Sequence, residues 1–492
     1  MPENIRIKSD EYKPIARGQA VVEARQAADG YVRVLSVSAA ASVRPSEIFA
    51  GEARYTGKVR FDCLVSDGTR VECVSTIAEF SDKISSPEIT AGMAVALVPE
   101  IVNCEATVEG GAIKMTAVVD TVGFAAVHCA CDCMTLPDDG VYVEKTTVEY
   151  GEVCAQATEI AYINDSIGGV KATEALCVSS RAIVTSAECS DGAVQVSGTV
   201  YSDVIVRTAD DLIASYRLTT PFIKSVAAQG AEEGCVAFAG ACVTDSAVAL
   251  ETGEENTLEL AVTMILDVAV IKKAQAEAFT DVFCADSEIE VETVEATLCT
   301  VEPQTTVTDT VDGQIALEPD RLAADNVLCV TNTFCTVADA RTDGGRVYAE
   351  GLVGGDIVYY NAEKNAVDSV AFRLPFSMPL SVHSDAQNVT ATAVVTDVSV
   401  RVRRESVFDI KAEVAFTLCL SSCRTVTLVG SVEIGEPIPR PNATVIVHIA
   451  KPGETLWQAA KALCCSPERV TEQNSATAPF EGGERLISFC NK

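Results

Sequence analysis

The sequence is poor in the side chains that most enzymes use for acid–base and nucleophilic catalysis. Only three histidines occur in 492 residues, and His128, His383 and His448 lie far apart. No G-x-S-x-G, H-E-x-x-H or G-x-x-x-x-G-K-[ST] segment is present, so the common signatures of hydrolases, zinc proteases and phosphate-binding loops are missing. None of the 70 acidic residues is singled out as a pair for glycoside hydrolysis. We therefore expect no enzyme, no catalytic residues, no cofactor and no bound metal.

Basic residues are also scarce. The chain has 37 Lys and Arg against 70 Asp and Glu, which gives a formal net charge of −33. Such a surface repels the phosphates of nucleic acids and of anionic lipids, so we expect neither as a partner. Two interpretations stay open: the partner surface is basic or neutral, or the acidic residues simply keep a component of an assembly in solution.

Signals for export and for membrane insertion are missing from the sequence. Its first residues, MPENIRIKSDEYKPIARGQA, contain no apolar core of a signal peptide, and no apolar run approaches the length of a transmembrane helix. We therefore expect a cytoplasmic protein.

The 20 cysteines are scattered, and many fall inside apolar strand patterns. In a leaderless chain this pattern favours reduced, buried cysteines over a disulfide framework.

What the sequence does contain is a pattern that occurs three times. A chain of this length implies three or four domains. Alternating polar and apolar residues surround a central glycine in RYTGKVRFDCLVSDG, QVSGTVYSDVIVRTADD and YAEGLVGGDIVYYNAEK, and a phenylalanine follows 23, 24 or 25 residues after that glycine. The three pairs are Gly57 and Phe80, Gly198 and Phe222, and Gly351 and Phe376.

Each copy continues into two further alternating segments joined by a polar turn, which is typical of half-buried antiparallel strands. The sequence therefore predicts a mainly β protein with three tandem all-β domains, and sandwich and open barrel remain equally possible. The proline-rich GEPIPRPNAT predicts a stiff linker after them. The predicted boundaries are 1–143, 144–284 and 285–434 for the β domains, 435–443 for the linker and 444–492 for a last, different domain.

That last domain, VIVHIAKPGETLWQAAKALCCSPERV and the residues after it, predicts a strand, two helices and a closing strand. Thr455 and Gln458 have the spacing of a capping box at the start of the first helix. Ser466 and Pro467 predict the cap and first turn of a second helix that ends near Asn474. The result is a βααβ arrangement, in which the helices cover one face of a two-stranded sheet.

The segments PGETLWQAA and SPERVTEQN make this domain similar to the LysM family over about its last fifty residues. In that family a shallow groove between two loops binds glycans that contain N-acetylglucosamine, such as peptidoglycan. The resemblance implies a groove with one wall at Gly453, Glu454, Thr455 and Leu456 and a second wall that starts at Asn474. Glu454 replaces the usual Asp of the G-D-T-L motif, and both glycan binding and a groove adapted to protein contact stay open.

Two further features have competing interpretations. The segment HCACDC carries His128, Cys129, Cys131 and Cys133, which are suitable ligands for a soft metal ion. Its cysteines would share one face of an extended strand, which favours buried core residues over a metal site. Trp457, the single tryptophan, is expected to pack in the core or anchor an interface rather than stack on a sugar.

Three β domains followed by a LysM domain resemble the SPOCS-domain plus LysM proteins of bacterial spore-coat assembly, the SipL-like morphogenetic proteins. The resemblance spans nearly the whole chain. It implies a non-enzymatic scaffold that acts in the mother cell at the forespore surface and docks a polymerising coat base-layer protein, the SpoIVA ATPase in that family. The alternative function is a peptidoglycan-binding cell-wall protein.

Overall fold

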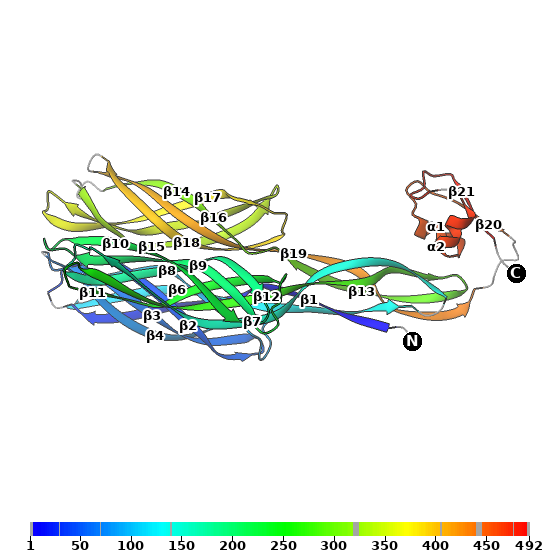
Figure 1. Cartoon of the computed structure of the whole chain (residues 1–492), viewed down its shortest axis with the longest axis horizontal. Helices are drawn as coiled ribbons and strands as arrows, with labels where there is room; N and C mark the ends of the chain where they lie inside the picture. Colours follow the sequence, from blue (N-terminus) through cyan, green and yellow to red (C-terminus); the bar gives the residue numbers. More distant parts are fainter. Residues whose placement is uncertain are drawn as a thin grey trace.

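The computed structural model describes residues 3–489 apart from 29, 69, 138–139, 318–323, 404–405, 439–444 and 476. It is 78% strand and 3% helical, so the prediction of a mainly β protein is confirmed. Figure 1 shows a broad head of long strands, a narrower stalk and a small helical module beside the far end of that stalk. No helix among the described residues is both long and apolar enough to cross a membrane.

The first part of the head, unit 1, consists of two three-stranded antiparallel sheets that pack face to face around two apolar clusters, with Phe80 in contact with both. The second and third strands of the chain form a short sheet with the fourth, in the order β2-β3-β4, and the long sheet has the order β1-β6-β5. The strands are β1 (Glu3–Ala27), β2 (Arg33–Phe49), β3 (Glu52–Ser66), β4 (Val71–Ser85), β5 (Ala96–Glu109) and β6 (Ala112–Leu136).

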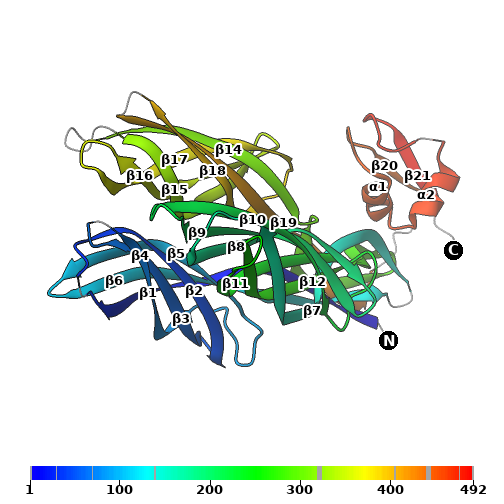
Figure 2. The same cartoon turned by 60° about the vertical axis from the view of Figure 1, so that its left-hand side comes forward.

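The same pairing order recurs in units 2 and 3, which are visible as separate lobes in Figure 2. In unit 3 the long first strand is divided in two, and both halves pair with the same partner, β19. Unit 2 contains β7 (Val141–Gly168), β8 (Glu174–Ser190), β9 (Ala193–Arg207), β10 (Ile213–Ala227), β11 (Val236–Glu251) and β12 (Thr257–Cys284). Unit 3 contains β13 (Ser287–Val301), β14 (Thr305–Ala316), β15 (Ala324–Asp343), β16 (Arg346–Asn361), β17 (Ala366–His383), β18 (Asn388–Arg403) and β19 (Val407–Pro437).

The glycine and phenylalanine of each repeated pattern are direct cross-strand partners, because Gly57 pairs with Phe80 and the other two pairs share this register. The phenylalanine ring lies over the glycine. A methyl group added at Gly57 would lie 2.5 Å from the ring of Phe80, and the corresponding distances in units 2 and 3 are 2.6 and 2.7 Å. The glycine is needed because it leaves room for the aromatic ring on the sheet surface.

The three short sheets face one another at the centre of the head. Leu64, Ile205 and Val358 each follow the repeated glycine by seven residues, and they lie together in one apolar cluster with exposed fractions of 2, 3 and 0%. Because side chains alternate along a strand, the neighbouring residues point back into the core of their own unit. The second halves of the central strands β3, β9 and β16 are therefore largely buried on both faces.

Polar contacts fix how each unit sits against the next. Arg60 of unit 1 donates to the carbonyl oxygen of Ser246 in unit 2 at 2.7 Å. Arg217 of unit 2 donates to the carbonyl oxygen of Thr396 in unit 3 at 3.2 Å. Both acceptors adjoin β-bulges at matching places in β11 and β18, so two successive contacts use the same part of the unit.

The stalk is formed by the ends of the longest strands, which continue beyond the head as three two-stranded ribbons: β1 with β6, β7 with β12, and β13 with β19. Ile7, Tyr150 and Leu298, one from each ribbon, lie in a common apolar core. An isolated two-stranded ribbon is at best marginally stable in water. The stalk therefore depends on the packing of all three ribbons.

The chain passes from one unit to the next at the far end of the stalk. There β6 ends at Leu136 and β7 begins at Val141. The start of β7 lies two residues before residue 143, the predicted end of the first β domain. The predicted boundary at residue 284 coincides with the end of β12. The predicted linker begins within β19, which continues to Pro437, and most of that linker lies outside the described residues.

The expectation that the cysteines are reduced is wrong for one pair. Cys299 of β13 and Cys423 of β19 lie directly opposite each other and form a disulfide. The other cysteines in the described ranges are free thiols. The segment HCACDC contributes to the stalk, where Cys131 and Cys133 pack in the same core as Ile7. His128 instead points outward and pairs with Asp10 at 2.7 Å.

The C-terminal module has the predicted order of elements: β20 (Val445–Ile449), α1 (Leu456–Leu463), α2 (Pro467–Gln473) and β21 (Arg485–Phe489). Thr455 and Gln458 form the capping box, and Ser466 caps α2 with Pro467 in its first turn. Ala459, Ala460 and Leu463 of α1 are buried in the core of the module, whereas Leu456 is half-buried.

Replacing the glycine under the aromatic ring tests the importance of the repeated pair. Gly57→Ala should destabilise the protein by about 1–3 kcal/mol because the new methyl group overlaps Phe80. Thermal unfolding monitored by circular dichroism measures the change. Gly240→Ala in β11 is the control, since a methyl group there meets no atom within 4 Å. Equal melting temperatures for the two variants would contradict the proposed role of the pair.

Glu100 should make the stability of unit 1 depend on pH. Burial, together with the nearby Asp120 carboxylate, raises the pKa of Glu100 to about 7 against the opposing effect of Arg17. The folded protein therefore holds this proton more tightly than the unfolded chain, and stability falls as pH rises from about 4.5 to about 7. Glu100→Gln should raise the melting temperature at pH 8 and leave it unchanged at pH 4.5. Glu105→Gln, in an exposed position of the same strand, should have little effect at either pH.

Candidate functional site

The two loops that the LysM resemblance names as groove walls do meet in the C-terminal module. Gly453 donates its backbone N–H to the carbonyl oxygen of Phe480 at 2.8 Å, and Phe480 donates to the carbonyl oxygen of Glu454 at 3.0 Å. Gly453 has a φ of +78°, a conformation that favours glycine. The first loop can therefore turn sharply and run beside the second.

Glu454 is part of the internal structure of this loop. Its side chain is 8% exposed, and its two carboxylate oxygens accept from the backbone N–H of Lys451 at 2.6 Å and contact Nε2 of His448 at 2.7 Å. Burial favours the neutral acid, but these hydrogen bonds and the His448 ring outweigh it and lower the pKa of Glu454. The carboxylate therefore ties the turn to β20.

The remaining groove residues also have structural tasks. Thr455 accepts from the N–H of Gln458 at 3.2 Å to cap α1. The side-chain amide of Asn474 donates to the carbonyl oxygen of Ile487 at 2.9 Å, and its oxygen accepts from the N–H of the same residue at 2.8 Å. The side-chain amide of Asn474 thus pairs with the backbone of Ile487 in the way that a neighbouring strand would.

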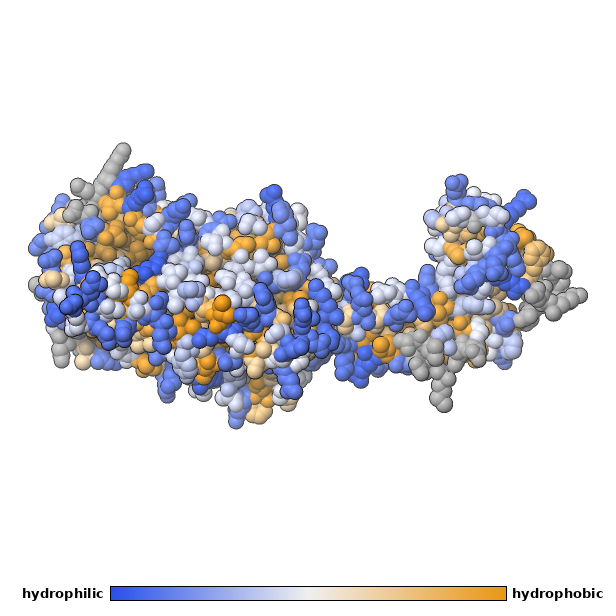
Figure 3. Space-filling model, in the orientation of Figure 1, coloured by the Kyte–Doolittle hydropathy of each residue, from blue (hydrophilic) through white to orange (hydrophobic). Residues whose placement is uncertain are grey.

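With these polar groups engaged internally, the most distinctive free surface of the module is apolar. Alternate residues of β20 point away from the helices. The register places Val445 beside Phe489 and Val447 beside Ile487 of β21, whereas Ile449 lies beside the charged Arg485 at the end of this face. Apolar residues also appear on the outer side of the module in Figure 3. We call this surface the outer strand face; its most exposed members are Val445 at 37%, Val447 at 57%, Ile449 at 61% and Phe489 at 46%.

The opposite side of the module is docked on the stalk through α1. Trp457 is 9% exposed, and its indole N–H donates to Asp281 of β12 at 2.9 Å. Lys461 contacts both oxygens of the same carboxylate, at 2.8 and 2.9 Å. The indole also packs edge-on against Phe283, with ring centroids 5.0 Å apart. Trp457 therefore anchors the interface between the module and the stalk, which is one of the two roles expected for it from the sequence.

Asp281 is the electrostatic centre of this contact. Partial burial disfavours its charge, but the hydrogen bonds from Lys461 and Trp457 outweigh burial and lower the pKa of this carboxyl. Sequence reasoning did not find Asp281 or Phe283, because they lie more than 170 residues before their partners in the chain. Their only local signal is an aromatic and an acidic residue at the end of an otherwise alternating strand.

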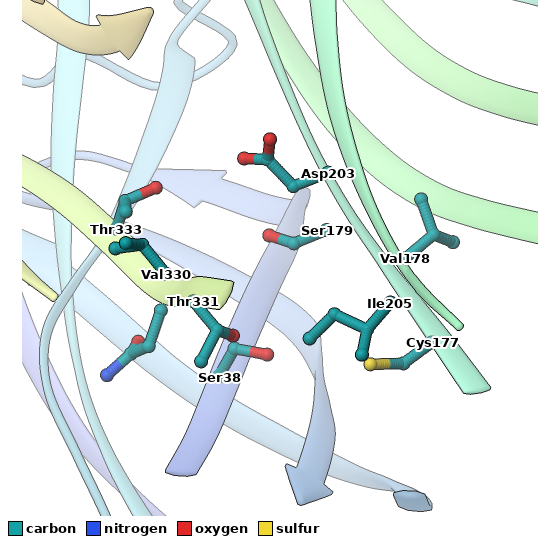
Figure 4. A pocket seen from close by; sticks show the side chains of 10 residues that line it. Ser38, Cys177, Val178, Ser179, Asp203, Ile205, Val330, Thr331 and Thr333 are labelled. Atoms are coloured by element: carbon teal, nitrogen blue, oxygen red, sulfur yellow. The ribbon is translucent and has the colours of Figure 1, made fainter. Parts of the chain in front are cut away.

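The described residues offer little that resembles a catalytic centre. The three histidines belong to β6, β17 and β20, on separate parts of the fold. An enclosed cavity lies where the three units meet, and Figure 4 shows Ser38, Ser179 and Thr331 around it, one from each unit. Its volume of about 10 Å³ matches a single water molecule at most. This cavity is too small for an organic substrate.

Comparison with protein-family models, with curated proteins and with solved structures finds no match to this chain. The function must therefore be argued from the residues themselves. Two features bear most directly on function: the docking of α1 on the stalk and the exposed outer strand face of the module.

Fluorescence of the single tryptophan can test the docking directly. Asp281→Ala removes the acceptor of both Trp457 and Lys461, so the module should leave the stalk and the emission of Trp457 should shift to longer wavelength as water reaches the ring. Glu277→Gln is the matched control, because Glu277 lies on the same strand but is well exposed and pairs with Lys145 of β7 instead of with the module. An unchanged spectrum for Asp281→Ala, with the fold intact, would show that Asp281 does not hold the module.

Proposed function

We propose that the protein is a non-enzymatic scaffold that docks a coat base-layer protein at the surface of a forming bacterial spore. The proposal includes the domain identities that the sequence resemblance suggests: SPOCS-like β domains for the three units and a LysM domain for the C-terminal module. It also includes the mother-cell cytoplasm at the forespore surface as the location. The resemblance and the character of the exposed surfaces support the proposal together.

The observation that carries the proposal is the position of the outer strand face. The module is docked through Trp457 and Lys461, which leaves Val447 and Ile449 exposed on the side of the module opposite its helices. Exposed apolar residues gathered on one face are typical of sites where another protein binds. An elongated stalk keeps this face away from the head, so a partner can reach it without touching the head (Figure 1).

The arrangement also suits binding at more than one point. The head offers its own exposed strands, and the module offers a second surface on the same chain. Two weak contacts on one molecule combine through their effective concentration into a firmer attachment. This property matches a scaffold that must stay on a polymerised layer while its individual contacts exchange.

Peptidoglycan binding remains the competing function, and the engaged side chains weigh against it. The LysM resemblance names Glu454 and Asn474 as groove residues, but their polar groups form hydrogen bonds within the module. A glycan recognises a groove mainly through polar groups and flat aromatic faces. Trp457, the largest such face, is covered by the stalk.

A binding assay with two targets separates these functions. We expect the full chain to bind immobilised SpoIVA-type ATPase and to be released by the double substitution Val447→Asp and Ile449→Asp, because charged side chains disrupt an apolar contact. Ile434→Asp is the matched control, since Ile434 is 44% exposed but lies in the β13–β19 ribbon of the stalk. Binding is measured by surface plasmon resonance, with a weakening of at least about tenfold expected for the double variant.

The contrary outcome is equally specific. Retention on purified peptidoglycan that is lost in Thr455→Val, without binding to the ATPase, would favour the cell-wall function and reject the scaffold.

A further inference from the structure

A group of potential metal ligands lies where the stalk joins the head. Cys299 and Cys423 are opposite each other on β13 and β19, and the carboxylate of Glu11 approaches them from β1. One ligand atom from each residue lies within 4.8 Å of the other two. It is the one group of three such residues found among the described parts of the chain. Two sulfurs and a carboxylate oxygen form a donor set that suits Zn²⁺.

We propose that reduction of the Cys299–Cys423 disulfide converts this cluster into a zinc site, with Glu11 as the third protein ligand. In the structure the two sulfurs are bonded to each other, so the site does not exist in the oxidised chain. A reductant breaks the S–S bond and leaves two thiols, while two molecules of a thiol reductant are oxidised to their own disulfide or one phosphine is oxidised to a phosphine oxide. Zinc then displaces the protons of the two thiols, binds the resulting thiolates and takes the Glu11 carboxylate as its third ligand.

The surroundings hold the three ligands in place before any ion arrives. The backbone N–H of Cys299 donates to the hydroxyl of Ser9 at 2.8 Å, which fixes β13 against β1. Glu11 accepts from the side-chain amide of Asn388 at 3.1 Å and pairs with Lys13 at 2.9 Å. These partners orient the carboxylate, as the hydrogen-bond partners of metal ligands generally do.

The charges are close to balance when zinc is bound. Two thiolates and one carboxylate carry three negative charges against the two positive charges of the ion. Lys13, which pairs with both Glu11 and Glu88, offsets part of the remaining negative charge. Without the ion, two thiolates beside Glu11 would repel one another, so the ion favours their deprotonation.

Solvent reaches this position through a cleft of about 390 Å³ that is lined by Glu11, Lys13 and Asn388. Cys299 itself is buried, with an exposed fraction of 1%, whereas Glu11 and Cys423 are half-buried. The ion can therefore enter from the Glu11 side. A water molecule from the cleft would complete the four-coordinate shell that zinc prefers.

The two states would link different parts of the protein. The disulfide connects β13 to β19, two strands that already pair with each other in unit 3. Zinc would instead connect this ribbon to β1, which belongs to unit 1. The reduced, metal-bound chain thus has a cross-link between the first and third units that the oxidised chain lacks.

Cobalt provides the test, because tetrahedral Co²⁺ bound to thiolates absorbs light and zinc displaces it. The full chain is reduced with a phosphine, which becomes a phosphine oxide by taking up the oxygen of water, and is then titrated with Co²⁺ and Zn²⁺ in the absence of oxygen. We expect one equivalent of thiolate-bound Co²⁺ that Zn²⁺ displaces. The oxidised chain should lack this equivalent, and the double variant Cys299→Ser and Cys423→Ser should lose it after reduction.

Two further variants make the assignment specific. Glu11→Gln should weaken zinc binding at least about tenfold, measured by competition with a chromophoric chelator. Cys464→Ser, which removes an exposed thiol in the module, should leave the affinity unchanged. Circular dichroism establishes that each variant is folded, and Glu11→Gln alone decides the question if the double cysteine variant does not fold. The proposal is overturned if Glu11→Gln binds zinc normally, or if the oxidised chain or the folded double cysteine variant keeps the same equivalent of thiolate-bound Co²⁺.

Discussion

The shared core of the stalk is the constraint on which the rest of the structure depends. Each ribbon has only two strands, and a ribbon of that kind cannot bury its apolar side chains alone. The three ribbons bury these side chains together, because each supplies part of one core that contains Ile7, Tyr150 and Leu298. Since each ribbon is continuous with the long sheet of its unit, the packing of the stalk also fixes the three long sheets relative to one another.

The same constraint decides where the C-terminal module sits. β12 reaches the end of the stalk with Asp281 and Phe283 among its last residues, and there the module finds an acceptor for its indole N–H and a ring to pack against. A hydrogen bond to a charged group contributes about 1.5–3 kcal/mol, and an aromatic pair adds about 0.5–1.5 kcal/mol. Such a contact is strong enough to dock the module on the stalk.

Much of the local structure was predictable because it depends on neighbours in the sequence. Alternation gives the strands, and the caps at Thr455 and Ser466 give the helix starts. The spacing of Gly57 and Phe80 revealed a motif, although the direct contact of ring and glycine appeared only in the register. The groove predicted from the resemblance stays a prediction, and the sequence did not show that Glu454 and Asn474 use their polar groups in hydrogen bonds within the module.

What could not be predicted depends on contacts between distant segments. An alternating strand has the same pattern whether it lies in a sheet of the head or in a ribbon of the stalk, so the stalk left no separate signal. The pairing of Cys299 with Cys423 spans 124 residues, and the docking of Trp457 on Asp281 spans more. In each case the sequence near one residue contains no signal for its partner, and the pair can be identified only once the fold brings the two segments together.

Amide hydrogen exchange in the stalk tests the central claim most directly. If the three ribbons share one core, the amides of Ile7, Val148 and Leu298 should exchange slowly and together, at rates comparable to those of the strands in the head. Exchange within seconds along the stalk, while the head remains protected, would show that the ribbons are independent and would contradict this account.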